Sequence, residues 1–376
     1  MKKKTFGFLP LITWFMLSAF TVIYNSGIPA NQEQYDGPYV LYKDNRVFVN
    51  YITRDNMLNG VYTDSLPLSQ KKNIQLRVNT DLPGNSFLVR LKDELQNEEA
   101  EYRRVNKQFI LSDIEGNFGA FRKLLQGNGV IDQDFNWTFG NGHLVLGGDF
   151  FDRGQQVTEV LWLIYSLEDK AKAAGGYVHF ILGNHEIMNL SMDLRYLHPK
   201  YIETDSLLHA SHDSLYGVNS ELGRWLRTKN VIEKIGDNLV MHGGISAELN
   251  QMDISVPGIN KLARPFYADT TYKYPDNRLN YIFDDLGPFW YRGYYKGTIQ
   301  ATPMQIDSTL EKFRVRHIIT GHTIVSDTIS VWFGGKLFNT DTHHAEGKSE
   351  ALFMEGGNYY RTDPSGKKLL LRNRNM

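Results

Sequence analysis

The chain has 376 residues, of which 41% are hydrophobic and 22% are charged, and its formal net charge at pH 7 is −1. This composition is that of a globular protein with one large core, or with one core plus a small appendage, and the near-zero charge argues against a general electrostatic attraction to nucleic acids. The chain contains no cysteine. Disulfides and thiolate metal sites are therefore excluded, and any metal ligands must be nitrogen or oxygen donors.

Three lysines, Lys2 to Lys4, precede an uncharged and mostly apolar stretch from Phe6 to Tyr24. A basic start followed by an apolar core is typical of a secretory signal. The stretch is longer than the roughly 7–15 apolar residues of most signals and approaches the roughly 20 that span a bilayer. We therefore predict that residues 1–30 are a signal peptide or a signal anchor. The rest of the chain is then exported, either periplasmic or anchored to the outer side of the inner membrane.

Residues 31–104 predict a small β-rich N-terminal extension. Val40–Tyr42, Arg46–Ile52 and Ser86–Leu91 are short runs rich in β-branched and aromatic residues, separated by Asp, Asn, Gly and Pro turns. No cluster of metal-ligating residues accompanies them, so we interpret the extension as a packing element. The charged segment Lys92–Arg104 is interpreted as a solvated helix or a linker.

Apolar runs of strand length alternate with helical segments from Gln108 onward. The predicted strands are Phe109–Leu111, Leu144–Leu146, Tyr177–Leu182, Leu239–Met241 and His317–Ile319, and the predicted helices are Phe118–Leu125 and Val157–Ala174. Each of these strands is followed closely by Asp, Asn or His. Because α/β sheets bind ligands at the carboxyl ends of their strands, these polar residues are predicted to converge on one site.

Five short motifs carry these polar residues. They are SDIEGN at 112–117, GDFFDRG at 148–154, GNHE at 183–186, HGG at 242–244 and TGH at 320–322. In this order they resemble the calcineurin-like metallophosphoesterases, and most closely the phosphoprotein-phosphatase branch with its bacterial Shewanella-like relatives. The resemblance implies an α/β fold over residues 105–376, with two mixed β-sheets in a sandwich flanked by helices.

The resemblance also implies two metal sites. One metal would be held by Asp113, Glu115 and Asp149, and the other by Asp149, Asn184, His242 and His322. Asp149 would then bridge two divalent cations. The expected metal is Mn²⁺, with Fe, Zn or Mg as alternatives, because the donors are carboxylates and imidazoles. In the family's chemistry a bridging hydroxide attacks phosphorus.

The remaining site residues are assigned on the same basis. His185 would be the general acid, held in place by Asp152. Arg153, and Arg292 in its Trp-Tyr-Arg-Gly context, would grip the phosphate, because a planar guanidinium can bind two oxygens at once.

Glu115 departs from the family pattern, which usually has histidine at this position and glycine at the position of Ser112. A carboxylate here adds negative charge and favours a harder ion such as Mn²⁺ or Mg²⁺. Two interpretations stay open: Glu115 is a metal ligand, or the first metal site is weak or vacant.

We predict a phosphatase that hydrolyses phosphomonoesters, such as a phosphopeptide, and binds no nucleic acid. The alternatives are a nucleotide or dinucleoside polyphosphate hydrolase on the same fold, or a catalytically silent phosphate-binding protein. Histidines without a motif are assigned to the surface or the core, namely His143, His179, His198, His212, His317, His343 and His344. The segment Met188–Asn230, which includes Tyr196, is a candidate roof for the cleft.

Overall fold

The computed structural model describes residues 24–26, 28, 33–55 and 58–372. The signal peptide or anchor predicted for residues 1–30 lies outside the described residues, apart from residues 24–26 and 28. Within the described ranges, none of the helices combines the length and the apolar character that a membrane span requires.

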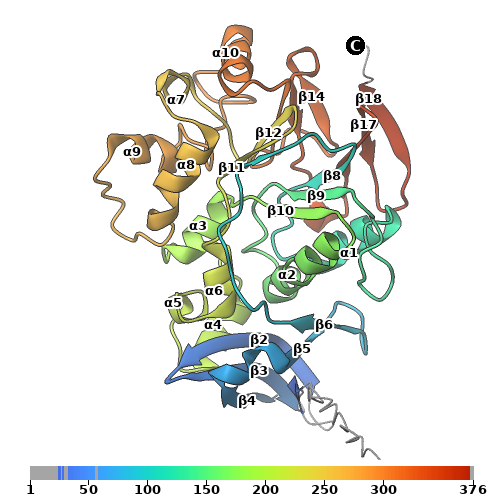
Figure 1. Cartoon of the computed structure of the whole chain (residues 1–376), viewed down its shortest axis with the longest axis vertical. Helices are drawn as coiled ribbons and strands as arrows, with labels where there is room; N and C mark the ends of the chain where they lie inside the picture. The colour runs from blue at the N-terminus through green and yellow to red at the C-terminus, as the bar shows by residue number, and fades with distance from the viewer. Residues whose placement is uncertain (1–23, 27, 29–32, 56–57, 373–376) are drawn as a thin grey trace, which may run out of the picture.

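Two six-stranded mixed sheets form the centre of the molecule (Figure 1). The first has the order β10-β9-β8-β16-β17-β18 and consists of β8 (Lys107–Leu111), β9 (His143–Leu146), β10 (Tyr177–Phe180), β16 (Ala351–Glu355), β17 (Asn358–Thr362) and β18 (Lys368–Arg372). The second has the order β14-β15-β13-β12-β11-β7 and consists of β7 (Glu101–Tyr102), β11 (Ile232–Ile235), β12 (Asn238–Met241), β13 (His317–Thr320), β14 (Ser330–Trp332) and β15 (Leu337–Asn339).

The two sheets pack face to face through the alternation of side chains along their strands. In β8, Ile110 belongs to the core between the sheets, whereas Phe109 and Leu111 belong to the core on the helical side. In β12, Val240 faces the inner core in the same way. Apolar residues on both faces are the pattern of strands that are covered on both sides. The predicted α/β class with two mixed sheets is therefore confirmed.

Helices cover the outer faces of both sheets (Figure 1). They are α1 (Phe118–Gly127), α2 (Val157–Ala173), α3 (Asn184–Leu190), α4 (Pro199–Leu207), α5 (His212–Leu215), α6 (Glu221–Leu226), α7 (Ala247–Gln251), α8 (Val256–Ala263), α9 (Asn277–Phe283) and α10 (Pro303–Phe313). The described part of the chain also contains the short 3-10 helices η1 (Leu68–Asn73), η2 (Arg264–Phe266), η3 (Phe333–Gly335) and η4 (His344–Glu346). The long helix α2 packs on β10 and, on its other side, on the N-terminal extension.

The N-terminal extension is β-rich, as predicted, and lies at the lower end of Figure 1. One antiparallel sheet contains β2 (Glu33–Lys43), β3 (Arg46–Asp55) and β4 (Leu58–Pro67), and a second sheet contains β1 (Tyr24–Ser26), β5 (Ile74–Asn79) and β6 (Ser86–Arg90). The extension is tied to α2 by the indole N–H of Trp162, which donates to the Pro38 carbonyl at 2.8 Å.

The segment Lys92–Arg104 contains no helix and includes the short strand β7, so of the two predicted alternatives, a solvated helix or a linker, the helix is wrong. Its charged groups have partners far away in the sequence. Glu98 accepts a hydrogen bond from Lys229 Nζ at 2.9 Å, and β7 joins the second sheet beside β11. A run of charged residues forms a solvated surface only where no residue distant in the sequence pairs with it. The local sequence does not show whether such a partner exists.

Candidate metal centre

The predicted ligands follow strands from both sheets. Asp113, Asp149 and Asn184 come after the parallel strands β8, β9 and β10, while His242 and His322 come after the parallel strands β12 and β13. Parallel strands present their carboxyl ends at the same edge of a sheet. The two edges meet, because the backbone N–H of His322 donates to both carboxylate oxygens of Asp113 at 3.1 Å.

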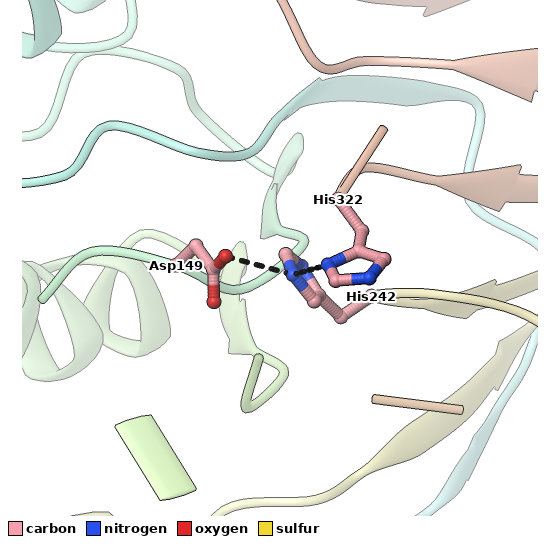
Figure 2. A group of neighbouring side chains, drawn as sticks. All are labelled: Asp149, His242 and His322. Atoms are coloured by element: carbon pink, nitrogen blue, oxygen red, sulfur yellow. Dashed lines mark hydrogen bonds and ion pairs between the residues drawn. The ribbon is translucent and has the colours of Figure 1, made fainter. Parts of the chain in front are cut away.

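Asp149, His242 and His322 form the first group of converging donors, which we call the histidine-rich cluster (Figure 2). His242 Nε2 lies 2.9 Å from Asp149 Oδ2 and 3.2 Å from His322 Nδ1. Asn184 Oδ1 lies 3.0 Å from the same Nε2. All four residues are buried. Each follows a different strand, and the other three donor atoms lie within 3.2 Å of His242 Nε2.

Both imidazoles of this cluster are oriented through their second nitrogen. His242 Nδ1 lies 2.8 Å from the Gly147 carbonyl, and His322 Nε2 lies 3.0 Å from the Trp290 carbonyl. A carbonyl only accepts, so these nitrogens carry protons and donate. The opposite nitrogen of each ring faces the cluster, and once a cation displaces any proton from it, its lone pair is placed as in metal-binding histidines.

Glu115, Asp149 and His185 form a second group, the carboxylate-rich cluster. It shares Asp149 with the first cluster. Its other members are held by protein groups: the Glu115 carboxylate contacts Arg153 Nη1, and His185 Nδ1 lies 2.6 Å from Asp152 Oδ2. Asp149 therefore lies between two sets of donors, as a bridging ligand requires.

The clustered acids and bases shift one another's pKa values. Burial raises the pKa of Asp113 to about 7, with Asp149 adding to the effect. Burial alone would lower the pKa of His242, but the charges of Asp149 and Asp113 outweigh it and raise the pKa to about 9. Burial alone would raise the pKa of Asp149, but the positive charges of His242 and His185 outweigh burial and lower it. Without a cation, these groups share protons that a bound metal would displace.

The backbone is strained at the site. Six of the ten predicted site residues have positive φ: Asp113 at 56°, Glu115 at 48°, Asp149 at 61°, Asp152 at 67°, Arg153 at 57° and His322 at 65°. Non-glycine residues in this region each cost about 1–3 kcal/mol, and such strain concentrates where side chains must be aimed at a ligand.

Two motif glycines are required by close contacts. A Cβ on Gly148, whose φ is 92°, would lie 2.7 Å from His242 Nδ1, and one on Gly321 would lie 2.3 Å from Asp113 Oδ2. The glycines of the GD and TGH motifs therefore allow neighbouring loops to approach the ligands.

Seven predicted residues line one cleft of about 340 Å³: Asp113, Glu115, Asp149, Arg153, His185, Arg292 and His322. The other three, Asp152, Asn184 and His242, are buried behind them. Arg292 Nη1 donates to the His322 carbonyl and, at 3.3 Å, to Thr323 Oγ1. All ten residues that the sequence selected thus lie in one region.

The cleft also contains residues that sequence reasoning did not select. Asp341 lines it, and burial together with the charges of Asp113, Glu115 and Asp149 raises its pKa well above the usual range. Its position in the sequence could have identified Asp341, because it follows the strand Leu337–Asn339 just as the predicted ligands follow their strands. His343 and His344, which the sequence assigned to the surface or core, line the same cleft.

Glu186 of the GNHE motif is a second residue without a predicted role. Its carboxylate is buried and accepts hydrogen bonds from the backbone N–H groups of Gly183 at 2.6 Å, Asp149 at 2.9 Å and Phe150 at 2.7 Å. It fixes the loop that carries Asp149. The motif position of Glu186 could have suggested this positioning role.

The calcineurin-like phosphoesterase family model matches residues 107–326, which is more than half of the chain. The chain belongs to this family. Family members are metal-dependent phosphoric ester hydrolases, and the donor set described above fits divalent cations because it consists of carboxylates, an amide oxygen and imidazoles that face a common cleft. The match confirms the predicted resemblance and the predicted hydrolase class.

Known proteins similar to this chain include phosphatases. The structure of a cold-active protein tyrosine phosphatase of a psychrophilic Shewanella species has 37% sequence identity and a TM-score of 0.80, with 90% of this chain and 99% of that chain covered. The Shewanella-like protein phosphatase 1 of Plasmodium berghei is 26% identical over 58% of this chain and 61% of its own length. An uncharacterized protein of Schizosaccharomyces pombe is 30% identical over 65% of this chain and 75% of its own length.

Proposed function

We propose that the protein is a dinuclear metal-dependent phosphomonoester hydrolase that acts on phosphotyrosyl peptides outside the cytoplasm. The observation that carries the dinuclear part is the position of Asp149, which is common to the histidine-rich and the carboxylate-rich clusters. One carboxylate with donors on both sides is the arrangement that a bridging ligand needs.

The proposed ligand sets are those that the sequence indicated. Asp113, Glu115 and Asp149 would hold one cation, and Asp149, Asn184, His242 and His322 would hold the other. Of the first set, Glu115 and Asp149 belong to the carboxylate-rich cluster, whose third member, His185, is the proposed acid, whereas Asp113 accepts from the backbone N–H of His322. Bound cations would activate the attacking water and neutralise charge on the phosphoryl oxygens. Mn²⁺ is the proposed metal, since hard oxygen donors outnumber the imidazoles.

His185 is the proposed general acid. Burial alone would lower its pKa, but the charge of Asp149 and the hydrogen bond with Asp152 outweigh it and raise the pKa to about 9. Asp152 is itself fixed by Asn189 Nδ2, which donates to it at 2.9 Å. A buried carboxylate that is anchored in this way orients the imidazole so that its other nitrogen can deliver a proton to the leaving oxygen.

Arg153 and Arg292 are the proposed phosphate ligands. Both line the cleft. Arg153 contacts Glu115, and half of its side chain is exposed to the cleft. A cation on Glu115 would release this guanidinium, which could then bind two phosphoryl oxygens through its fork of N–H groups.

Tyr196 supports an aromatic substrate. Its ring centroid lies 5.2 Å from that of His185, and the guanidinium carbons of Arg153 and Arg195 lie 5.4 and 5.8 Å from it. Tyr196 is 43% exposed. An exposed aromatic face beside the proposed acid can stack on the ring of a tyrosyl leaving group. The similarity to a Shewanella tyrosine phosphatase supports the same substrate class.

Export is proposed from the sequence, because Lys2–Lys4 and the apolar stretch after them form a signal-like segment. A fusion that joins a reporter phosphatase, active only outside the cytoplasm, after residue 30 tests this. Reporter activity is expected in intact cells. A fully cytoplasmic, inactive reporter would contradict export.

The activity is tested with one substrate panel. Purified protein with Mn²⁺ is expected to hydrolyse phosphotyrosyl peptides faster than phosphoseryl peptides of the same sequence, and faster than nucleotides and dinucleoside polyphosphates. A chelator should abolish turnover, and added Mn²⁺ should restore it. Preferential cleavage of nucleotides would favour the nucleotide hydrolase instead. Absence of turnover with Mn²⁺, Zn²⁺, Fe²⁺ and Mg²⁺ would favour a silent phosphate-binding protein.

A further inference from the structure

A second cavity, of about 270 Å³, lies at the opposite ends of the strands that carry the proposed ligands. Gln108, Asn238 and His317 line it, and these residues stand at or next to the first residues of β8, β12 and β13. A strand of four or five residues is about 13–17 Å long. The cavity is therefore separate from the catalytic cleft and connected to it by three shared strands.

We call this space the basal cavity and define it by Arg104, Gln108, Arg316, His317, Tyr359 and Arg372. Its lining is unusually cationic for a chain whose net charge is −1. Among the described lining residues, Arg104, Arg316, Lys336 and Arg372 are cationic and Asp237 is the single acid.

The cations of the basal cavity are only partly neutralised. Lys336 pairs with Asp307, which is not a lining residue, but Arg104 Nη1 approaches Asp237 Oδ2 only to 3.9 Å. Burial, and then the charges of Arg372 and Arg316, lower the pKa of His317 to about 4. His317 is therefore neutral at pH 7, and the positive potential comes from the arginines.

The interior of the cavity is polar and incompletely paired. Tyr359 Oη lies 2.7 Å from His317 Nδ1, which is 3.2 Å from Asn238 Oδ1. Gln108 is only 1% exposed, and its side-chain oxygen has no hydrogen-bond partner. A buried acceptor without a partner is rare in folded proteins, so this oxygen points to a donor supplied by a bound molecule. A water could also satisfy this oxygen, but only an anion would in addition engage the guanidinium groups of Arg104, Arg316 and Arg372 that line the same cavity.

We propose that the basal cavity binds a small anion that also carries a hydrogen-bond donor, with hydrogenphosphate or the monoanion of a phosphomonoester as the matching chemistry. Arg104, Arg316 and Arg372 supply the guanidinium groups, which suit tetrahedral oxyanions. Gln108 Oε1 accepts a hydrogen bond from the phosphate hydroxyl. The volume is close to the roughly 300 Å³ of the smallest ligand pockets, and Leu310 and Met354 offer apolar contact to a short carbon body.

Inorganic phosphate is the probe, and thermal unfolding of the metal-free protein in a chelator is the measurement. The metal-free protein does not turn over substrate, so this experiment tests phosphate binding alone. The cavity proposal can therefore fail while the proposed phosphatase function holds, and the phosphatase function can fail while the cavity proposal holds. Phosphate titrated against chloride at equal ionic strength is expected to raise the Tm of the wild-type protein in a saturable way, by about 3 °C at a hundredfold excess over Kd. Absence of a saturable rise would overturn the proposal.

Two neighbouring arginines provide a matched pair of variants. Arg104 lines the cavity, whereas Arg103 is also exposed but does not line it. Arg104→Gln should weaken phosphate binding about tenfold, and Arg103→Gln should leave Kd unchanged. Equal effects of the two variants would show that general charge, and not this cavity, is responsible.

Two further measurements show where the anion binds. Arg292→Gln, in the catalytic cleft, should leave the phosphate-dependent rise intact, and its loss would place the anion in the cleft and overturn the proposal. Sulfate stabilises proteins generally but has no hydroxyl donor at neutral pH, so it should bind at least fivefold more weakly than phosphate. Equal binding of the two anions would overturn the role given to Gln108.

Discussion

The histidine-rich and the carboxylate-rich clusters share Asp149 but hold their other side chains in different ways. In the first, backbone carbonyls orient His242 and His322 and leave one nitrogen of each ring facing the cluster. In the second, Glu115 contacts Arg153 and His185 is bound by Asp152. A cation at the first cluster displaces only protons, whereas one at the second must compete with a guanidinium for Glu115. We therefore expect tighter metal binding at the histidine-rich cluster.

The largest effect is expected from His242→Ala, because its Nε2 contacts Asp149, Asn184 and His322 at once. Loss of this ligand should lower kcat/KM for an aromatic phosphomonoester about 1000-fold and remove about one equivalent of bound Mn²⁺. His209→Gln, at an exposed histidine, is the control. Activity within tenfold of wild type, with an unchanged Tm, would contradict the central role of this cluster.

Arg153→Lys tests the carboxylate-rich cluster, where Arg153 contacts Glu115. Lysine keeps the charge but cannot bind two oxygens in the guanidinium geometry, so kcat/KM should fall about 30-fold. The same substitution also replaces the guanidinium that contacts Glu115 by a more mobile ammonium, which should compete less for this carboxylate, so Mn²⁺ should bind the carboxylate-rich cluster more tightly. Steady-state kinetics and calorimetric metal titration measure the two effects. Weaker Mn²⁺ binding would refute the competition.

Glu115→His restores the residue that the resemblance leads one to expect. If Glu115 is a ligand, the ratio of activity with Zn²⁺ to activity with Mn²⁺ should rise about tenfold, because an imidazole replaces a harder carboxylate. Total activity with the preferred metal should stay within about fivefold. Glu115→Gln, which removes the charge and keeps the shape, separates charge from donor type. An identical metal profile in all three proteins would rule out Glu115 as a ligand.

Tyr196→Leu should have the smallest effect, since this ring lies beside the clusters rather than within them. We expect a threefold to fivefold loss of preference for phosphotyrosyl over phosphoseryl peptides, about the contribution of one aromatic pair. Tyr196→Phe keeps the ring and should retain the preference. A preference that survives the change to leucine would remove Tyr196 from substrate recognition.

Much of the fold could be predicted because its strands are short continuous apolar runs that end in turn residues. The predicted strands at Phe109 and Leu144 and the helix at Val157 correspond to β8, β9 and α2. The path of Lys92–Arg104 could not be predicted, because Glu98 meets Lys229, a residue 131 positions away. Local sequence carries no information about such a partner.

The site divides in the same way. Sequence alone selected Asp149, His242 and the other motif residues, because each follows a strand and belongs to a motif with family order. Tertiary structure decided that Asp341 lines the same cleft, that Glu115 meets Arg153, and that the arginines around Gln108 surround a second cavity. Motifs record which side chains the chemistry needs. The distances and charges between them arise only when strands from two sheets are brought together, because those contacts join residues that are far apart along the chain.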